Sequence, residues 1–542
     1  MLKYITKTSK TSTKDSSISA SASASSSDNM ASSAASVATD IQKMSRIITS
    51  RGYAVLKSAL TDKQQQLIRK ELTVAPAVLE AYSKSINPFP IYCESASRYY
   101  VPRAWGITNL GEPEANIVSN GVPLPESVTF KGKPYDYQEQ IISTFIDKGA
   151  NGLICVPCGR GKTFMALNIA VRLGHRFLIV VDKEFLMNQW KGEIENYVSG
   201  MRVGIIQGPK VEIDPEKYDC TICMLQTICQ RDYAPNFFAG YGLAIFDECH
   251  KLGAQVFSRS LMKIQVRNML GLSATPDRDD GLTKVFEYYL GKPVYQEKVR
   301  EPDSSVVVQA IWFRSEDPAY AEVPKNWKGE TVTAKLMTQI VTCKPRTAKI
   351  VEIIRELSED ANRQLLVLAE RKCLLEDFEN SLKTLKNSRK ENYRVGYYIG
   401  GMDSEVLDKN AATCQILLAT YAMASDALNI KTLNTCVMAS PRKKVEQSTG
   451  RILRLRPENR KANPIIVDVI DQHETYVRQW WIRQRYYKQC EYTIEHINRK
   501  KETSVARQAS ADGCLISFSG SGGDDEEKTA LEEGAVDSEY DE

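Results

Sequence analysis

The chain has 542 residues, of which 42% are hydrophobic and 25% charged, so it can form several domains with ordinary cores. Its apolar runs stay below the ~20 residues of a membrane span, which argues against a membrane partner, and thirteen cysteines without a secretory signal favour an intracellular protein with reduced thiols. Residues 524–542 carry a charge of −9 and residues 1–523 a charge of +13, and such a basic body indicates a polyanionic partner such as nucleic acid.

The two ends of the chain have compositions that cannot form a core. Residues 1–44 are mostly Ser, Thr and Ala, and residues 502–542 are acidic, so we predict a disordered tail at each end. Residues 45–130 are predicted to form a small accessory domain. Its aromatic residues either stack on nucleic-acid bases or form the core, and we favour the core; they include Tyr92, Tyr99, Tyr100 and Trp105.

Two regions alternate short apolar runs with helical patterns, as parallel α/β domains do. In the first, residues 131–300, we expect strands at 152–156, 177–181, 203–206, 220–224, 243–246 and 269–272. In the second, residues 346–501, we expect strands at 364–369, 394–398, 415–419, 435–439 and 464–468. A less regular linker, residues 301–345, separates them. Two such lobes in tandem form a cleft that suits a nucleotide and a long polymer.

The last part of the second region, residues 470–501, is predicted to be helical and mixes aromatic residues with cations. Two interpretations stay open. Aromatics interleaved with cations form nucleic-acid surfaces, whereas a helix docked on the second lobe leaves its charges in solvent. The residues concerned are Trp480, Trp481, Tyr486, Tyr487, Tyr492, Arg478, Arg483, Arg485, Lys488, Arg499, Lys500 and Lys501.

The segment between the first expected strand and the helical pattern after it is typical of a phosphate-binding loop, although Val156 stands where the strict pattern has glycine. Glycines at 159 and 161 let the backbone turn tightly, so that successive N–H groups point at a polyphosphate. Lys162 is predicted to reach the β- and γ-phosphates, and Thr163 to bind Mg²⁺. We assign the nucleotide loop to Pro157, Cys158, Gly159, Arg160, Gly161, Lys162 and Thr163.

An acidic motif follows the apolar run 243–246. Asp247 and Glu248 stand at the end of that expected strand, in the sequence Asp-Glu-Cys-His. Asp247 there suits a magnesium ligand, and Glu248 suits a residue that orients the attacking water. A helix cap, the alternative, would not need four apolar residues immediately before it. Together the two motifs predict hydrolysis of a nucleoside triphosphate with Mg²⁺ as cofactor.

Taken in order, these motifs resemble those of superfamily 2 helicases, particularly the XPB-like branch and its relatives in large DNA viruses. The resemblance covers about residues 130–490 and implies two RecA-like lobes with ATP as the nucleotide. Gln138 stands where the family reads adenine. The family's coupling motif, which links hydrolysis to movement, matches Ser273, Ala274 and Thr275.

The resemblance also implies contacts with the nucleic-acid backbone. The positions that match are Lys183, Gln189, Gln226 and Thr420. The segment from Thr420 to 430 is similar to the family's fifth motif, with departures that put its coupling efficiency in question. Asp426, Ala427 and Asn429 stand where Glu, Gly and Asp are usual.

The family completes its ATP site from the second lobe. The segment 447–454 matches the arginine-finger motif, which implies catalytic roles for Gln447, Arg451 and Arg454 beside Lys162 and the acidic pair. On a helix, residues three apart share a face, so the spacing predicts that both arginines reach one γ-phosphate.

We therefore expect an ATP hydrolase that couples hydrolysis to movement along single-stranded or duplex DNA, because the extension at 276–281 is commoner in DNA-directed members. The alternatives are an RNA-directed helicase and a nucleic-acid-binding regulator with a weakened motor. Proteins of transcription or repair are the expected partners. The expected locations are the nucleus, a cytoplasmic viral factory or the virion.

Overall fold

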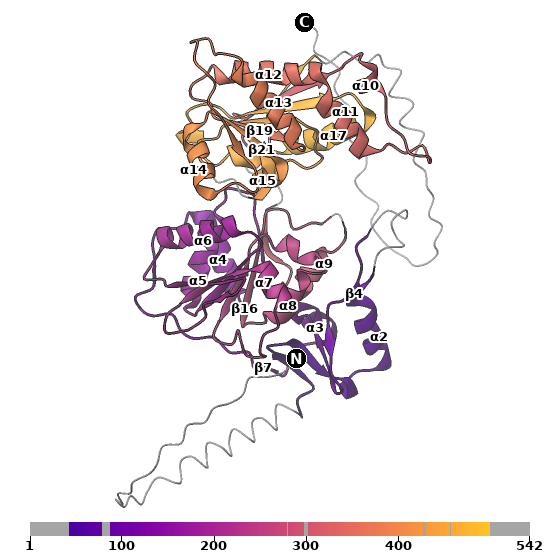
Figure 1. Ribbon diagram of the computed structural model, residues 1–542. Coiled ribbons are helices and arrows are strands. Elements are labelled where there is room, and N and C mark those ends of the chain that lie inside the picture. Colours follow the sequence, from indigo (N-terminus) through magenta and orange to yellow (C-terminus); the bar gives the residue numbers. More distant parts are fainter. Residues whose placement is uncertain are drawn as a thin grey trace, which may run out of the picture.

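The computed structural model describes residues 43–77, 87–278, 280–297, 302–426, 430–455 and 457–498. Nearly all of both predicted tails lies outside these ranges. Figure 1 shows a small N-terminal domain, a first lobe against it, and a second lobe stacked on the far side of the first. Among the residues described, no helix combines the length and apolar composition needed to cross a membrane.

The N-terminal domain contains a five-stranded sheet. Its strand order is β5 (Cys93–Glu94), β6 (Arg98–Val101), β2 (Gly52–Leu56), β1 (Arg46–Thr49) and β7 (Ala115–Asn116). Its helices are α2 (Asp62–Glu71) and α3 (Arg103–Leu110), and a separate pair joins β3 (Thr73–Val74) to β4 (Phe89–Pro90). Tyr99 and Trp105 are buried, which confirms for these two residues that the aromatics form a core.

The first lobe is built on an eight-stranded sheet in which every neighbouring pair is parallel except β12–β13. Its strand order is β13 (Lys210–Val211), β12 (Val203–Gln207), β14 (Cys220–Met224), β10 (Phe177–Val181), β15 (Leu243–Phe246), β16 (Asn268–Ser273), β9 (Asn151–Cys155) and β17 (Pro293–Gln296). Its helices are α4 (Asp136–Asp147), α5 (Lys162–Leu173), α6 (Glu184–Tyr197), α7 (Leu225–Gln230), α8 (Ser258–Lys263) and α9 (Thr283–Leu290). A short pair joins β8 (Thr129–Phe130) to β11 (Val198–Ser199).

Both faces of the central strands are covered, which is why they are continuously apolar. All five residues of β10 are buried, with Leu178 and Val180 in one core cluster and Phe177, Ile179 and Val181 in another. The first of these clusters also contains the buried residues of the N-terminal domain. The two bodies therefore share one core.

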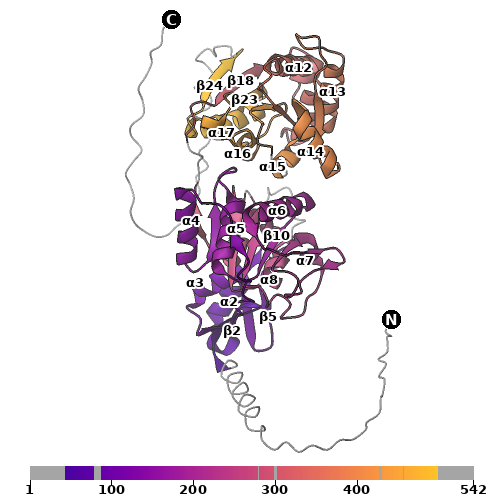
Figure 2. The ribbon, with the colours of Figure 1, turned by 90° about the vertical axis from the view of Figure 1, so that its left-hand side faces the viewer.

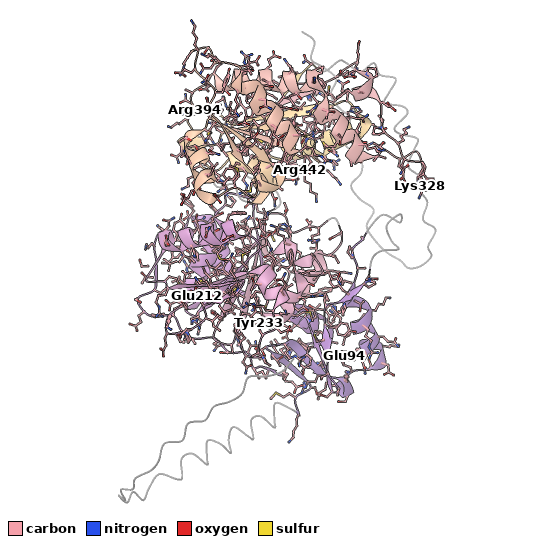
Figure 3. The ribbon with its side chains drawn as sticks, viewed as in Figure 1. Glu94, Glu212, Tyr233, Lys328, Arg394 and Arg442 are labelled. Carbon is pink, nitrogen blue, oxygen red and sulfur yellow. The ribbon has the colours of Figure 1, made fainter. Side chains whose placement is uncertain are left out.

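Polar contacts reinforce this junction. Arg103 is buried, and its Nη2 and Nη1 donate to Val266 O at 2.6 Å and Arg267 O at 2.9 Å. Tyr289 OH in α9 donates to Ile91 O at 2.5 Å. Figure 3 shows Glu94 at the end of the molecule away from the second lobe, so the N-terminal domain lies on the outer side of the first lobe.

The second lobe is built on a seven-stranded sheet with parallel neighbours throughout. Its strand order is β20 (Val395–Tyr398), β21 (Ile416–Thr420), β19 (Leu365–Ala369), β22 (Thr435–Met438), β23 (Ile465–Asp471), β18 (Val307–Phe313) and β24 (Thr493–Ile497). Its helices are α10 (Pro318–Ala321), α11 (Thr333–Thr342), α12 (Lys344–Ser358), α13 (Lys372–Lys383), α14 (Ser404–Thr413), α15 (Tyr421–Asp426), α16 (Glu446–Thr449) and α17 (Glu474–Gln489).

Two sequence predictions are wrong in this lobe. The segment 301–345 was expected to be a linker, but it supplies β18, which pairs with β23 on one side and β24 on the other. The helix expected over 470–501 is confirmed by α17, but the prediction is wrong at both ends, because β23 extends to Asp471 and β24 follows α17. The two errors differ in cause. The strand β18 is an apolar run of the kind that marks the other strands, whereas β24 is mostly exposed and polar and carries no such run.

The inner face of α17 is docked on the second lobe. Trp480 and Tyr487 are fully buried, and Arg483 Nε pairs with Asp468 Oδ2 at 2.7 Å. The docked-helix interpretation is therefore confirmed for this face. The outer face exposes Trp481 and three cations, for which a nucleic-acid surface stays a prediction; the cations are Arg478, Arg485 and Lys488. Arg499, Lys500 and Lys501 lie outside the described residues.

A buried ion pair ties α12 to β23. Arg346 and Asp471 side chains are 1% and 0% exposed, and two bonds of 2.7 and 2.8 Å join the guanidinium to the carboxylate. We expect Asp471→Ala to lower the free energy of unfolding by about 3–5 kcal/mol, because it leaves a buried charge without its partner. Chemical denaturation measures the loss. Glu474→Ala, which removes the exposed partner of Arg478, should change stability by about 0–1 kcal/mol, and equal losses would contradict the account.

Candidate ATP and nucleic-acid site

The phosphate loop joins β9 to α5 and holds two glycines in left-handed backbone conformations. Gly159 and Gly161 have φ angles of 87° and 80°, which side-chain-bearing residues rarely adopt. A Cβ on Gly161 would lie 2.4 Å from Gln138 Nε2, so a larger residue would displace that side chain. Lys162 is the first residue of α5, and the amide groups at a helix N-terminus favour phosphate.

Gln138 braces this loop. Its side chain is buried, its Nε2 donates to Arg160 O at 3.2 Å, and its Oε1 accepts a bond from Tyr135 N at 3.1 Å. Tyr137 OH also donates to Arg160 O, at 3.3 Å, and the Arg160 guanidinium lies 4.1 Å from the Tyr137 ring. Arg160 Nε pairs with Glu297 Oε2 at 3.1 Å. The adenine-reading role stays a prediction, and these bonds add a second role in holding the loop.

Lys162 and the acidic pair come from separate segments and act on one another electrostatically. Burial lowers the pKa of Lys162, but Cys158, Glu248 and Asp247 raise it, so that its pKa lies above the ordinary value. Burial, followed by the neighbouring Glu248 carboxylate, raises the pKa of Asp247 above its usual range. The structure thus brings the predicted lysine and both predicted acids into one charged cluster.

The cluster offers the oxygen donors that Mg²⁺ prefers, in the Thr163 hydroxyl and the Asp247 carboxylate. Glu248 Oε2 is buried without a hydrogen bond and lies 3.4 Å from His250 Nδ1. A buried carboxylate oxygen with unused hydrogen-bonding capacity fits a residue that orients water. Among the described residues, no group of three or more His, Cys, Asp or Glu side chains could hold a metal.

Glu248 is held in an unusual backbone conformation. Its φ is 46°, in the left-handed region, at the start of a 3₁₀ helix over Cys249–Gly253. Such a conformation costs a non-glycine residue about 1–3 kcal/mol, and strain of this kind is typical of functional sites. Asp247 Oδ1 accepts a bond of 3.0 Å from Glu248 N and so stabilises this turn.

The predicted coupling motif connects the acidic motif to the second lobe. His250 Nδ1 lies 3.1 Å from Ser273 Oγ, which accepts a bond of 3.2 Å from Thr275 N. Thr275 Oγ1 in turn accepts a bond of 3.3 Å from Gln447 Nε2 in α16. Ala274 lies between the two polar residues and is partly buried. This chain of contacts crosses from the first lobe to the second, and Figure 2 shows α15 and α16 on the side that faces α4, α5 and α6.

The prediction that Arg451 and Arg454 share a helical face is wrong. α16 and the 3₁₀ helix after it end before Arg454, because the chain leaves the helical path after less than two full turns. Arg451 is buried, and its positive charge lowers the pKa of Lys162, which places it close to the phosphate loop. Burial raises the pKa of Glu193 in α6, and Lys431 and Arg454 lower it. Burial also raises the pKa of Tyr398, which the charges of both arginines lower.

Three of the predicted nucleic-acid contacts lie at or just beyond the carboxyl ends of parallel strands, where α/β proteins bind ligands, and Gln189 lies within α6. Lys183 and Gln189 follow β10, Gln226 follows β14, and Thr420 ends β21. Lys183, Gln189 and Thr420 are partly exposed. Gln226 Nε2 is engaged within the protein, because it donates to Asp182 O at 2.7 Å. Three departures from the fifth motif lie outside the described side chains: Asp426, Ala427 and Asn429.

Sequence reasoning missed two residues that hold the acidic segment. Trp190 Nε1 donates to Asp247 Oδ2 at 2.9 Å, and Lys251 Nζ pairs with Asp182 Oδ2 at 2.7 Å. A buried Trp in an apolar helical pattern reads as core, and nothing in the sequence signals that its Nε1 reaches a carboxylate 57 residues away. The Asp-Lys pair likewise joins two segments whose contact only the fold creates.

Comparison with known proteins finds a matching family and several viral relatives. Residues 131–278 match the family described as type III restriction enzyme, res subunit. A protein of Acanthamoeba polyphaga mimivirus, named as a candidate ATP-dependent RNA helicase (L396), is 31% identical over 458 residues, which cover 83% of this chain and 86% of that protein. QP509L of African swine fever virus (strain Badajoz 1971), named in the same way, is 27% identical and covers 66% of this chain and 74% of its own. A candidate helicase (161L) of Invertebrate iridescent virus 6 is 28% identical, covering 67% and 82%.

The matched family segment contains the phosphate loop, the acidic motif and the coupling motif. The mimivirus similarity spans 458 residues and therefore extends well beyond that segment. The mixed α/β architecture with two parallel sheets is the fold that this family requires. The chain belongs to the superfamily 2 helicases and is similar to the helicases of large DNA viruses.

Proposed function

We propose that this helicase hydrolyses ATP with Mg²⁺ and couples the hydrolysis to movement along DNA, in transcription or repair. The observation that carries the proposal is a site built from both lobes. Lys162 in the first lobe is affected electrostatically by Arg451 of the second, and Gln447 is hydrogen-bonded to Thr275 across the same boundary. A site divided between two bodies responds to their relative position, as a motor requires.

The chemistry depends on positioning and charge neutralisation, without a covalent protein intermediate. Lys162 would bind the β- and γ-phosphates, and Thr163 and Asp247 would hold the ion. Mg²⁺, when bound with ATP, neutralises part of the phosphate charge. Glu248 orients the attacking water through Oε2, which lies near His250 and makes no hydrogen bond within the protein. Arg451 stabilises the negative charge that grows on the transferred phosphoryl group.

Nucleic acid enters this scheme through the two lobes. Lys183 on the first lobe and Thr420 on the second lie at the carboxyl ends of their sheets, and Gln189 lies on the helix that follows Lys183, so one nucleic-acid strand can contact both bodies. Such a strand would hold the lobes together and bring Arg451 onto the phosphates. The contacts from Gln447 through Thr275 and Ser273 to His250 would carry the change to Glu248.

The substrate proposal concerns DNA rather than RNA. It is supported by the extension that follows the coupling motif, where Arg278 Nε bonds Asp280 Oδ1 at 2.9 Å and Arg278 Nη1 donates to His250 O at 2.6 Å. This extension is typical of DNA-directed members. The names of the mimivirus and African swine fever virus relatives favour RNA, which makes an RNA-directed helicase the second candidate.

Stimulated ATP turnover discriminates between the two candidates. We expect single-stranded or duplex DNA to raise the ATP hydrolysis rate of the full chain, with a smaller effect of RNA of matched length and sequence. The three polymers are compared at one salt concentration, because phosphate contacts make binding strongly salt-dependent. Stimulation by RNA with none by DNA would reject the DNA proposal. The absence of turnover with all three would favour a nucleic-acid-binding regulator with a weakened motor.

Location and protein partners follow from the proposed activity. A DNA-directed motor similar to viral helicases would act in the nucleus or in a cytoplasmic viral factory, or be packaged in the virion. Its protein partners would be transcription or repair factors. Co-purification of the tagged full chain with such factors from infected cells tests this part of the proposal.

A further inference from the structure

Trp190 connects the helix of the predicted nucleic-acid contacts to the carboxylate that is proposed to hold the metal. Its side chain is 1% exposed, and its Nε1 donates to Asp247 Oδ2 at 2.9 Å. Gln189, the residue before it, is partly exposed and is one of the predicted nucleic-acid contacts. Two consecutive residues of α6 therefore belong one to the predicted nucleic-acid contacts and the other to the surroundings of the proposed metal ligand.

The second oxygen of the same carboxylate is also held. Asp247 Oδ1 accepts a bond of 3.0 Å from Glu248 N, so each oxygen has its own donor and the carboxylate plane is fixed. An indole N–H suits this task because it only donates, and its rigid ring is packed in the core of the first lobe. Partners that orient a metal ligand typically contribute about 10–100-fold to metal affinity or activity.

An ion pair near the start of α6 makes a second contact with the acidic segment. Asp182 lies two residues before the first residue of α6. Its Oδ2 pairs at 2.7 Å with Nζ of Lys251, which lies four residues after Asp247 in the sequence. Gln226 Nε2 donates to Asp182 O and fixes that turn. Held at Asp182 and at Trp190, the acidic segment must move with α6 when the helix moves.

The same helix also contacts the second lobe. Phe185 in the first turn of α6 packs against the buried core cluster of the second lobe. Glu193, near the other end, is influenced by the charges of Lys431 and Arg454. α6 therefore touches the predicted nucleic-acid path, the metal-holding carboxylate and the opposite lobe.

We propose that Trp190 is a positioning residue that orients Asp247 for Mg²⁺ and makes metal affinity depend on nucleic acid bound at α6. The inference rests on the proposed function, since it requires Asp247 to hold the ion. It assigns to Trp190 a different task from the backbone contact that the family resemblance implies for this segment. By thermodynamic reciprocity, a nucleic acid that strengthens metal binding is itself bound more tightly when the metal is present.

The test compares two tryptophans in matching surroundings. Trp105, in the N-terminal domain, is also 1% exposed, and its Nε1 donates to a carboxylate oxygen, Glu71 Oε2, at 2.9 Å. Trp190→Phe and Trp105→Phe each remove one indole donor from a buried ring. Binding of a fluorescent non-hydrolysable ATP analogue to the full chain is measured at increasing Mg²⁺ concentrations. The titration is done with and without a single-stranded DNA oligonucleotide, and it gives the Mg²⁺ concentration for half-maximal binding.

We expect Trp190→Phe to need roughly 10–100-fold more Mg²⁺ for half-maximal analogue binding, with no effect of the oligonucleotide. Wild type and Trp105→Phe should bind at low Mg²⁺, and the oligonucleotide should lower the required concentration further. ATP turnover of Trp190→Phe should recover toward wild type at saturating Mg²⁺, which a general loss of structure would not allow. A wild-type Mg²⁺ titration for Trp190→Phe, or an oligonucleotide effect that survives in it, would overturn the proposal.

A second measurement leaves the tryptophan intact and covers the case in which Trp190→Phe fails to fold. The chain has six tryptophans, so ¹⁵N-tryptophan labelling gives few indole N–H resonances. Asp247→Asn should shift the Trp190 resonance and leave that of Trp105 in place. An unmoved Trp190 resonance would overturn the inference. The proposed function fails separately, if the wild-type chain hydrolyses no ATP at any Mg²⁺ concentration.

Discussion

Arg451→Ala should bind ATP and DNA with near-wild-type affinity and lose about 10³–10⁵-fold in DNA-stimulated turnover. The physical reason is that Arg451 belongs to the second lobe, while the phosphates are held by Lys162 in the first. Its guanidinium neutralises charge that develops in the transition state, so its loss affects the rate more than ground-state binding. Steady-state ATP hydrolysis and equilibrium binding of a fluorescent ATP analogue separate the two effects.

Two further arginine variants make this test specific. Arg389→Ala removes an exposed cation of the second lobe and should leave turnover unchanged. Arg454→Ala should cost less than Arg451→Ala, because Arg454 lies beyond the helical segment and its charge acts on Glu193. Equal losses for Arg451→Ala and Arg454→Ala would show that the structure assigns the two arginines wrongly. Figure 3 shows Arg442 in the part of the second lobe that lies toward the first, so Arg442→Ala reports whether any cation on that side matters.

Lys162→Ala should reduce ATP turnover by roughly 10²–10³-fold, with or without DNA, and should also weaken ATP binding. Lys162 sits at the N-terminus of α5 among Cys158, Glu248 and Asp247, and its raised pKa keeps it charged at neutral pH. Replacement by Ala leaves the two carboxylates without their nearest cation. Turnover and analogue binding are measured as for the arginine variants.

The matched control for the lysine is Glu248→Gln. It keeps the size of the side chain and removes the charge of the buried, unbonded oxygen. We expect Glu248→Gln to bind ATP and to lose hydrolysis. It therefore differs from Lys162→Ala in ATP binding, which only the lysine variant should weaken. Near-wild-type turnover in Lys162→Ala would reject the assignment of this loop, whatever the second variant does.

The parts of the site that the sequence could predict are those written in consecutive residues. Gly159 and Gly161 mark the loop because their backbone angles exclude most other residues, and Asp247 stands at the end of a strand that is apolar along its whole length. Central strands of a covered parallel sheet leave a strong signal of this kind. For the strands expected in the two lobes, the observed limits lie close to the predicted ones, apart from the longer β23.

The sequence could not predict which distant segments contact or pair with one another. Trp190 reaches Asp247 only because α6 packs on β10 and β14, and β10 pairs with the strand β15 that leads into Asp247. β18 is a central strand only because β23 and β24 return to pair with it. The spacing of Arg451 and Arg454 suggested one face, but a helix that ends after seven residues cannot present them together. Pairing and helix length are tertiary properties, which local patterns do not encode.

Displacement of streptavidin from biotinylated single-stranded DNA tests the coupling of ATP hydrolysis to movement most directly. Substrates with biotin at the 5′ end and at the 3′ end are compared, so that either direction of travel is detected. We predict ATP-dependent displacement from one end by the wild-type chain, and none with a non-hydrolysable analogue or with Arg451→Ala. A chain that hydrolyses ATP in the presence of DNA but displaces streptavidin from neither end would contradict the account.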